Sequence, residues 1–435
     1  MPVGFWAFCL AFGVFPCGRA EEAPVETWKM GSFTLHALLQ PFRLSWYFDG
    51  KLLLAQRGSQ TTTPGGRRSA SLEFLDDGGW HALANVIGRR GGAQDAQSKD
   101  GGLIRITFEV ASAGGGKAEV EVSYTPREGA PRVALALDPA QGAGKIVAVR
   151  DDLISFPGES LIVVPWSTPL GPGAPLLVSL EKNRPSPPKL GGAAGGERLL
   201  FSSRGFGLYV GAGKSEHAEV LLPDPDTIRI QASGLRLEYR IFPGKPKEVL
   251  ERSALHLQEK ESSGGSKEDR FLVDDWAALR RLVDSAMMAA LLAQRFPRVV
   301  SIRPKEGEKE DEAQELVRRA MQAVALLPNV KLSDPAGLSG SKEAGLGQPL
   351  PLFVEFPQDP DAWRIGDEWL IGGRFLAAPV LDQGKERREI YFPEGLWTSL
   401  RKKEPPSPPI RGPARISVEV PLGESVALFE REREK

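Results

Sequence analysis

Cysteine, histidine and asparagine are all scarce in this chain, and each scarcity excludes a class of site or modification. Only two of the 435 residues are cysteine, Cys9 and Cys17, and both lie in an apolar stretch at the N-terminus. A chain without that stretch could form no disulfide bond. The four histidines are scattered along the N-terminal part, so we expect no metal site, and no motif points to another cofactor. None of the three asparagines begins a glycosylation sequon, which excludes N-linked glycans.

Net charge and long apolar runs are lacking too. Fifty-five Lys and Arg residues against 56 Asp and Glu residues leave a formal net charge of -1. A charge this small gives no long-range attraction to nucleic acid or to an anionic membrane surface, so we expect neither as a partner. The apolar run over residues 3–15 is about 13 residues long, too short to span a bilayer comfortably.

The same N-terminal run has the pattern of a secretory signal. It is followed by Gly18-Arg19-Ala20, a small-x-small cleavage pattern, which predicts a signal peptide over residues 1–20. Because no Lys or Arg precedes the run, an apolar N-terminal strand or short helix is the alternative. We expect the protein to enter the secretory pathway, with the extracellular space or the ER lumen as its location.

Most of the N-terminal half consists of short runs in which apolar and polar residues alternate. Clear examples are residues 103–110, 118–124, 132–137 and 236–242, separated by Gly, Pro, Asp and Arg clusters. This pattern is typical of half-buried β-strands. About a dozen such strands over residues 25–257 predict an N-terminal β-sandwich.

A polar, Gly-containing stretch over residues 258–269 predicts a linker, and the periodicity then changes. Apolar residues recur at intervals of three and four from Trp276, which predicts a helix with Asp274 or Asp275 as its N-cap. A second helix is predicted over residues 311–327, and the charged run 305–312 before it is expected to be a solvated loop.

From residue 349 to the C-terminus the chain returns to a β pattern. We expect strands over residues 375–381, 388–392 and 416–429. The Pro-rich residues 404–413 are expected to form an exposed loop. These features predict a C-terminal β-domain over residues 349–435.

The most specific motifs in the chain lie between residues 347 and 397. They are PLPLF at 349–353, EFPQD at 355–359, EWLIG at 368–372, AAPVL at 377–381 and YFPEGLW at 391–397. In this order and spacing they resemble the region where the catalytic barrel of glycoside hydrolase family 31 ends and its distal β-domain begins. Residues 201–210 look like part of the N-terminal sandwich in the myogenesis-regulating glycosidase and SITS-binding-protein-like branch of that family.

The resemblance implies an N-terminal β-sandwich, a (β/α)8 barrel and a C-terminal β-domain, but the barrel does not fit. Such a barrel needs roughly 250 residues. Only about 90 residues, 258–348, separate the predicted sandwich from the C-terminal domain. The two predicted helices are similar to the last two helices of the family's barrel. The expected fold class is therefore mainly β with a small α/β remnant: N-terminal β-sandwich, truncated (β/α)8 barrel remnant over residues 270–348, and C-terminal β-domain.

A shortened barrel leaves the predicted first helix without its usual neighbours. Its apolar side chains Leu279, Val283, Met287 and Leu291 would otherwise cover a closed barrel. Either another surface covers them or this region is unstable.

The catalytic groups that the resemblance implies are largely missing. The family's retaining mechanism needs two carboxylates about 5 Å apart, one nucleophile and one acid/base. The nucleophile motif W-x-D-M does not occur; Asp49 follows an aromatic run but lies in the predicted sandwich. By position, Asp274 and Asp275 are the candidates for the acid/base, and helix capping explains them equally well.

Candidate substrate contacts are also few. The resemblance places the family's arginine on Arg319, and Trp363 is an aromatic candidate for stacking on a sugar ring. Trp80, Trp166 and Trp397 could stack in the same way, although each is equally expected in a core or an interface.

Three functional classes remain open. The first is a catalytically inactive family 31-like protein that binds carbohydrate or another protein in the secretory pathway. The second is an α-glycosidase, hydrolysing O-glycosyl bonds, of which this chain is a shortened isoform or gene model. The third is a regulatory or chaperone-like subunit of a glycosidase.

Overall fold

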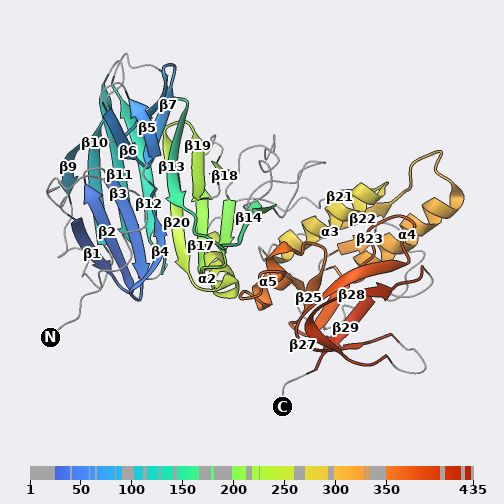
Figure 1. Ribbon diagram of the computed structural model, residues 1–435. Helices are drawn as coiled ribbons and strands as arrows, with labels where there is room; N and C mark the ends of the chain where they lie inside the picture. The colour runs from blue at the N-terminus through green and yellow to red at the C-terminus, as the bar shows by residue number, and fades with distance from the viewer. Residues whose placement is uncertain are drawn as a thin grey trace, which may run out of the picture.

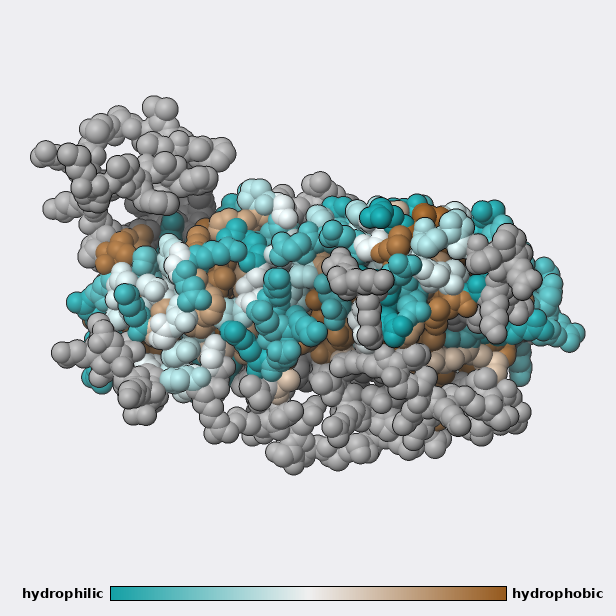
Figure 2. All heavy atoms as spheres, turned by 90° about the horizontal axis from the view of Figure 1, so that it is seen from below, coloured by the Kyte–Doolittle hydropathy of each residue, from teal (hydrophilic) through white to brown (hydrophobic). Residues whose placement is uncertain are grey.

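The chain is elongated, with a large N-terminal β-structure at one end and a smaller mixed structure at the other (Figure 1). On the face shown in Figure 2, hydrophilic and hydrophobic residues are intermixed along the molecule. The computed structural model describes residues 25–39, 42–57, 59–63, 66–83, 85–90, 102–110, 115–126, 129–140, 145–165, 178–180, 198–211, 218–224, 226–258, 270–291, 298–327, 330–332, 349–401, 407–422 and 427–432.

Three antiparallel sheets and a hairpin form the N-terminal structure. The nine-stranded sheet has the order β15-β14-β16-β17-β20-β12-β11-β10-β9. Its strands are β9 (Val86–Arg90), β10 (Gly102–Glu109), β11 (Gly116–Tyr124), β12 (Arg132–Pro139), β14 (Leu161–Pro165), β15 (Val178–Leu180), β16 (Arg198–Ser202), β17 (Phe206–Gly211) and β20 (Arg236–Pro243).

The other two sheets have the orders β18-β19-β13-β7-β8 and β1-β2-β3-β4. The five-stranded sheet contains β7 (Leu72–Asp76), β8 (Gly79–Ala82), β13 (Ala148–Ile154), β18 (Ala218–Asp224) and β19 (Thr227–Ser233). The four-stranded sheet contains β1 (Val25–Met30), β2 (Phe33–Leu39), β3 (Phe42–Phe48) and β4 (Lys51–Ala55), and the hairpin is β5 (Ser59–Thr63) with β6 (Gly66–Ala70).

Alternation along the strands explains how the sheets pack. In β10, Ile104, Ile106 and Phe108 are buried, whereas Arg105 between them is exposed. A strand with this period of two places one face against a core and the other toward solvent. The buried faces of all three sheets contribute to one continuous apolar core.

A helix, α2 (Pro246–Gln258), follows the last strand of the sandwich. Pro246 occupies its first position and Glu248 its first turn, both favourable at a helix start. The helix lies against β16, β17 and β20. Gly207 makes this approach possible, because a Cβ at that position would overlap the Val249 side chain.

The central part is a small α/β unit. Its strands β21 (Arg270–Val273), β22 (Arg298–Ile302) and β23 (Val330–Leu332) form a parallel sheet in that order. Helix α3 (Trp276–Leu291) connects the first pair and α4 (Glu310–Val324) the second. Val273 and Val300 face the helices, whereas Leu272 is 51% exposed.

The C-terminal part is built on one six-stranded antiparallel sheet with the order β24-β25-β26-β29-β27-β28. Two short helices, α5 and η2, lie between its first two strands. The elements are β24 (Pro349–Pro351), α5 (Leu352–Glu355), η2 (Ala362–Arg364), β25 (Trp369–Ile371), β26 (Phe375–Ala378), β27 (Arg387–Ser399), β28 (Ile410–Glu419) and β29 (Ala427–Arg431).

The apolar face of α3 is covered by two different surfaces. Leu279, Val283 and Met287 belong to a buried cluster that also contains side chains of α4 and of the six-stranded sheet, among them Trp369. Leu291, at the end of the helix, belongs instead to a cluster that includes sandwich residues. The C-terminal sheet and the sandwich together thus replace the barrel surface that these residues would otherwise cover.

The apolar cluster that contains Leu291 also joins the two ends of the molecule. It contains Phe201 of β16, Val249 of α2, Phe353 of α5 and Trp363 of η2. The Phe353 ring lies 5.6 Å from the Phe201 ring and 4.9 Å from the Trp363 ring, measured between centroids. Figure 1 shows α2 and α5 side by side at this junction.

The expected fold class is confirmed: mainly β, with a small α/β remnant between the sandwich and the C-terminal β-domain. Two local predictions were incomplete. Helix α2 was not predicted, and β28 begins at Ile410 inside the expected loop. Pro413 is tolerated there because β28 is an edge strand, where a missing N–H need not break a ladder. The predicted signal peptide and residues 259–269 of the predicted linker lie outside the described residues.

Candidate functional site

The parallel strands of the α/β unit bring four charged residues to one edge. Asp274 and Asp275 directly follow β21, and Arg303 and Lys305 follow β22. The strands are in register, and the Arg303 N–H donates to the Val273 carbonyl at 2.9 Å. The carboxyl edge of a parallel barrel sheet is where active sites form. This edge is therefore the candidate site.

Asp275 has both carboxylate oxygens occupied. Oδ1 accepts a hydrogen bond from the Ala278 N–H at 2.7 Å, and Oδ2 accepts one from Lys305 Nζ at 2.5 Å. Asp275 is thus the N-cap of α3, one of the two residues expected in that role. The hydrogen bond from Lys305, followed by that from Ala278, lowers the pKa of Asp275. A lowered pKa disfavours the protonated form that a general acid must supply.

Asp274 is half-buried beside this pair, and its charge helps to raise the pKa of Lys305, after the larger effect of the Asp275 hydrogen bond. The two carboxylates come from one strand end. Because Arg303, Pro304 and Lys305 directly follow the neighbouring strand, that strand contributes basic groups at this position. The edge therefore resembles a helix cap closed by an ion pair more than the facing carboxylates of a glycosidase.

Arg319 lies on α4 but points into the C-terminal sheet region. It is 1% exposed, and its Nη2 donates to the Val420 carbonyl at 2.6 Å and to the Lys385 carbonyl at 3.1 Å. Its Nη1 donates to Gln322 at 3.3 Å. Through these hydrogen bonds Arg319 connects α4 to the C-terminal part of the chain. Contact between Arg319 and a substrate stays a prediction.

Trp363 is 2% exposed in the cluster that joins the sandwich to the C-terminal part. Its Nε1 donates to the Pro357 carbonyl at 3.0 Å. Neither ring face is thus presented at the surface for a sugar. The structure does not bring Trp363 together with Asp274, Asp275 or Arg319 through any contact among the described residues.

The other tryptophans differ in their accessibility. Trp397 is fully buried, with its Nε1 donating to the Pro393 carbonyl at 2.8 Å. Trp80 is half-buried, and the Arg150 guanidinium lies 3.9 Å from the centre of its ring. Trp166 lies outside the described residues. Trp80 is thus the most accessible of the candidates that the structure describes.

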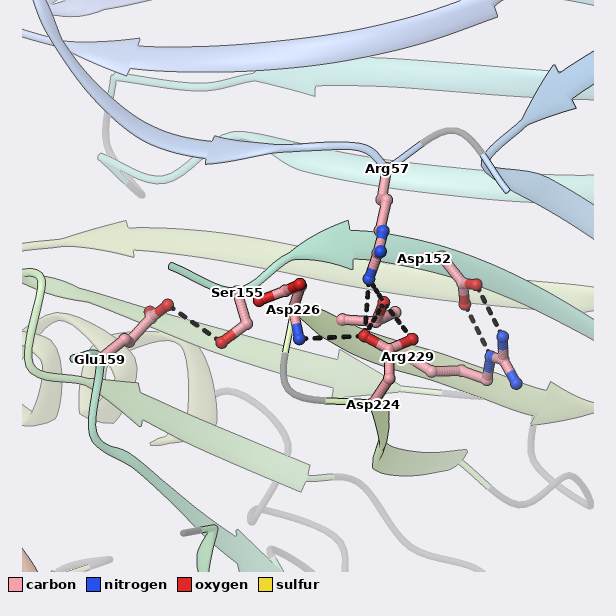
Figure 3. Close-up of polar contacts among 8 residues, drawn as sticks. Arg57, Asp152, Ser155, Glu159, Asp224, Asp226 and Arg229 are labelled. Atoms are coloured by element: carbon pink, nitrogen blue, oxygen red, sulfur yellow. Dashed lines mark hydrogen bonds and ion pairs between the residues drawn. The ribbon is translucent and has the colours of Figure 1, made fainter. Parts of the chain in front are cut away.

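Sequence reasoning missed a polar network in the sandwich, shown in Figure 3. Arg229 binds Asp152 through two hydrogen bonds of 2.7 Å, and Arg57 donates to Asp224 at 2.6 Å. Each pair connects neighbouring segments of the sandwich, with no ligand needed to explain it. Two successive acids, Asp151 and Asp152, inside a strand whose two ends are apolar were the available signal.

Asp151 points to the other side of the same strand, into the core. It accepts hydrogen bonds from Gln56 Nε2 at 2.7 Å and from the Tyr239 hydroxyl at 3.0 Å. Gln56 in turn accepts the Leu44 N–H at 2.7 Å. Burial raises the pKa of Asp151 to about 7. This residue links all three sheets of the sandwich through hydrogen bonds.

Neither a metal site nor a membrane span is found in the part of the chain that the structure describes. No group of three or more His, Cys, Asp or Glu side chains there could hold a metal ion. Within the same residues, no helix has both the length and the apolar character needed to cross a bilayer.

Comparison with known proteins gives one family match and several partial relatives. Residues 348–433 match the family described as the glycosyl hydrolase family 31 C-terminal domain. Lysosomal alpha-glucosidase of Rattus norvegicus is 38% identical over 101 residues, 22% of this chain and 10% of that protein. The SITS-binding protein of Tetronarce californica is 32% identical over 152 residues, 27% of this chain and 22% of that protein.

Myogenesis-regulating glycosidase of Mus musculus is 44% identical over 57 residues, 13% of this chain and 8% of that protein. The chain thus matches well under two thirds of each of these relatives. Among solved structures, a family 31 sulfoquinovosidase from E. rectale aligns with a TM-score of 0.52 and 10% identity, over 92% of this chain and 98% of that chain. At that identity the likeness concerns the fold alone.

Proposed function

Because this chain is related to glycoside hydrolase family 31, we propose that it is a catalytically inactive member that binds carbohydrate or another protein, such as a glycosidase, in the secretory pathway. The observation that carries the proposal is the edge formed by β21 and β22. There Asp275 caps α3 and pairs with Lys305, and basic residues directly follow the neighbouring strand.

This arrangement argues against turnover on physical grounds. Retaining hydrolysis needs an ionised nucleophile and a protonated acid that approach the sugar from opposite sides. Asp275 is held ionised by Lys305 and by a helix N–H, and Asp274 comes from the same strand end. Two carboxylates that leave one strand end cannot easily flank a glycosidic bond.

An activity assay tests the inactive state. The purified full chain is incubated with aryl α-glucosides, α-galactosides and α-xylosides between pH 4.5 and 7.5, beside the Asp274→Asn/Asp275→Asn double variant. We expect the two proteins to release aryl alcohol at the same background rate. Hydrolysis by the parent chain that the double variant has lost would refute the proposal.

A glycan array tests the binding part of the proposal. Trp80 is the position to substitute. It is the most accessible of the candidate tryptophans that the structure describes, and Arg150 already orients its ring. If the chain binds sugar there, Trp80→Ala abolishes the signal and Trp80→Phe retains much of it. Binding that Trp80→Ala leaves unchanged would exclude this surface, and an array without any signal would favour a protein partner.

A second candidate function, an α-glycosidase of which this chain is a shortened form, is favoured by one structural observation. Parallel sheets are normally covered on both faces. Here α3 and α4 cover one face of the three-stranded sheet, and Leu272 on the other is 51% exposed. Transcripts that encode a W-x-D-M motif between residues 258 and 269 would support this candidate, and their absence would remove it.

A further inference from the structure

The face of the four-stranded sheet that points away from the core carries two neighbouring aromatic rings. Along β2 and β3 every second residue is buried, so the residues between them lie on the outer face. His36 of β2 and Tyr47 of β3 are half-buried on that face, with their ring centroids 4.6 Å apart. They are diagonal neighbours, because His36 pairs with Ser45 and Tyr47 with Thr34. The two rings together form an aromatic surface that solvent reaches.

Hydroxyl groups and a lysine surround this ring pair. Two rows of side chains cross the outer face from β1 to β3, Lys29–Thr34–Tyr47 and Thr27–His36–Ser45. Strands in a sheet are about 4.8 Å apart, so Lys29 and Tyr47 are about 10 Å apart at their backbones. Lys29 is exposed, and among the residues that the structure describes no ion pair or hydrogen bond engages its side chain. Rings, hydroxyls and an ammonium group therefore share one surface.

The four strands of this sheet contain a single acid. Glu26 lies on the core side of β1, where it pairs with Arg89 of β9. Further basic groups lie beside the ring pair. Arg43 of β3 is on the outer face, and Arg204, from the turn after β16, donates to the Leu52 carbonyl of β4 at 3.0 Å. The outer face is thus positively charged, with no carboxylate from its own strands.

The other two sheets of the sandwich balance the charges on their outer faces. On the nine-stranded sheet, Arg132 pairs with Glu121 at 3.2 Å and with Glu238 at 2.8 Å. On the five-stranded sheet, Arg229 binds Asp152 through two hydrogen bonds of 2.7 Å. In both sheets the charges of neighbouring strands satisfy one another. The positive charge of the four-stranded sheet lacks such compensation from its own strands, which makes this face suited to an anionic ligand.

The groups on this face together select a class of ligand. Aromatic side chains pack on the apolar face of a sugar ring, and hydroxyl side chains exchange hydrogen bonds with sugar hydroxyls. An ammonium group binds a carboxylate or a sulfate, whereas a neutral sugar would leave Lys29 unused. We propose that the outer face of the four-stranded sheet binds an anionic oligosaccharide, with His36 and Tyr47 as the platform and Lys29 holding an acidic substituent.

This inference rests on the proposed function, of which it specifies the binding surface and the class of sugar. The face belongs to the N-terminal part of the molecule, away from the edge formed by β21 and β22 (Figure 1). Trp80, the other candidate for sugar contact, is on the five-stranded sheet. The two surfaces can therefore be tested separately.

Isothermal titration of the purified full chain with three octasaccharides tests the site. One is derived from heparin and carries sulfates and carboxylates, one is derived from polygalacturonate and carries carboxylates alone, and maltooctaose is neutral. We expect an anionic octasaccharide to bind, more weakly at 300 mM than at 50 mM NaCl, and maltooctaose not to bind. Lys29→Ala should weaken the binding about tenfold, because a charge-assisted hydrogen bond is lost. Tyr47→Ala should weaken it about as much, and Tyr47→Phe should retain it.

Lys117→Ala is the matched control, since it removes an exposed lysine from β11, on the outer face of the nine-stranded sheet. It should keep the affinity of the parent chain. Equal weakening by Lys117→Ala and Lys29→Ala would show attraction by overall charge and overturn the inference. If Tyr47→Ala does not fold, Lys29→Ala, at an exposed position, carries the test, and unchanged binding by that variant counts against the site.

Failure of this site is distinguishable from failure of the proposed function. Binding of maltooctaose alone, or anionic binding that is lost in Trp80→Ala and kept in Lys29→Ala, would overturn this site while carbohydrate binding stands. Absence of binding to all three octasaccharides would overturn the site and remove the carbohydrate part of the proposed function. A single-stranded RNA octamer that binds as tightly as the anionic sugar would overturn the class of ligand, because bases also stack on aromatic side chains.

Discussion

Substitution of Phe353 tests whether the apolar junction holds the two ends of the molecule together. Phe353 is 1% exposed, and its ring contacts those of Phe201 and Trp363. Truncation of a buried phenylalanine to alanine costs about 3–5 kcal/mol of unfolding free energy. Since the lost contacts lie between the sandwich and α5, Phe353→Ala should also uncouple the two parts.

The assay is urea-induced unfolding followed by both tryptophan fluorescence and circular dichroism. The parent chain should unfold in one transition that the two signals report together, and Phe353→Ala should give two separate transitions. Phe392→Ala is the matched control, because Phe392 is fully buried against Phe429 inside the C-terminal sheet, away from the junction. Phe392→Ala should destabilise the C-terminal part to a similar extent, but its pattern of unfolding transitions should differ from that of Phe353→Ala.

The reasoning would be refuted if Phe353→Ala cost less than about 1 kcal/mol, or if it unfolded in the same way as Phe392→Ala. The nearby ion pair provides a further check. Lys247 and Glu355 are 3.7 Å apart, and the lysine side chain is 61% exposed. An exposed pair contributes about 0–1 kcal/mol, so Lys247→Ala should leave the junction intact.

Three further predictions concern single charged groups. The pKa of Asp151 is about 7 in the fold, and its ordinary value is 3.8. The free energy of unfolding should therefore fall by about 3 kcal/mol as the pH rises from 4 to 7, and Asp151→Asn should flatten that slope in chemical denaturation. Arg319→Leu leaves the buried Val420 carbonyl and the more accessible Lys385 carbonyl without their donor and should cost about 1–3 kcal/mol in the same assay, whereas Arg318→Leu, at an exposed position, should cost little. Asp275→Ala removes the cap of α3 and should lower stability by about 1 kcal/mol, more than Asp274→Ala.

Local patterns were enough to predict most of the fold. Alternating residues marked strands such as β10 and β11, because a half-buried strand must alternate. Helices α3 and α4 were recognised by their apolar spacing, and the capping role of Asp275 by its place before Trp276. Helix α2 also carried a local signal. Pro246 and Glu248 lie in its first turn, directly after the turn that precedes the helix.

The candidate site was harder to predict because its contacts join distant residues. Arg319 donates to Val420, 101 positions later, and Lys305 pairs with Asp275, 30 positions earlier. No local pattern distinguishes an arginine that binds backbone carbonyls from one that binds a substrate. Likewise, Trp363 could be assigned to a buried junction only once α2 and α5 were seen to meet.

The central claim, that this family 31 relative is not a glycosidase, is tested most directly by trapping the covalent intermediate. A retaining enzyme forms a glycosyl-enzyme bond, which fluorinated α-glycosyl fluorides cause to accumulate. We predict that the intact mass of the full chain is unchanged after incubation with such reagents of the gluco, galacto and xylo series. A mass increase of one fluoroglycosyl group, mapped by peptide sequencing to any carboxylate of the chain, would contradict the account.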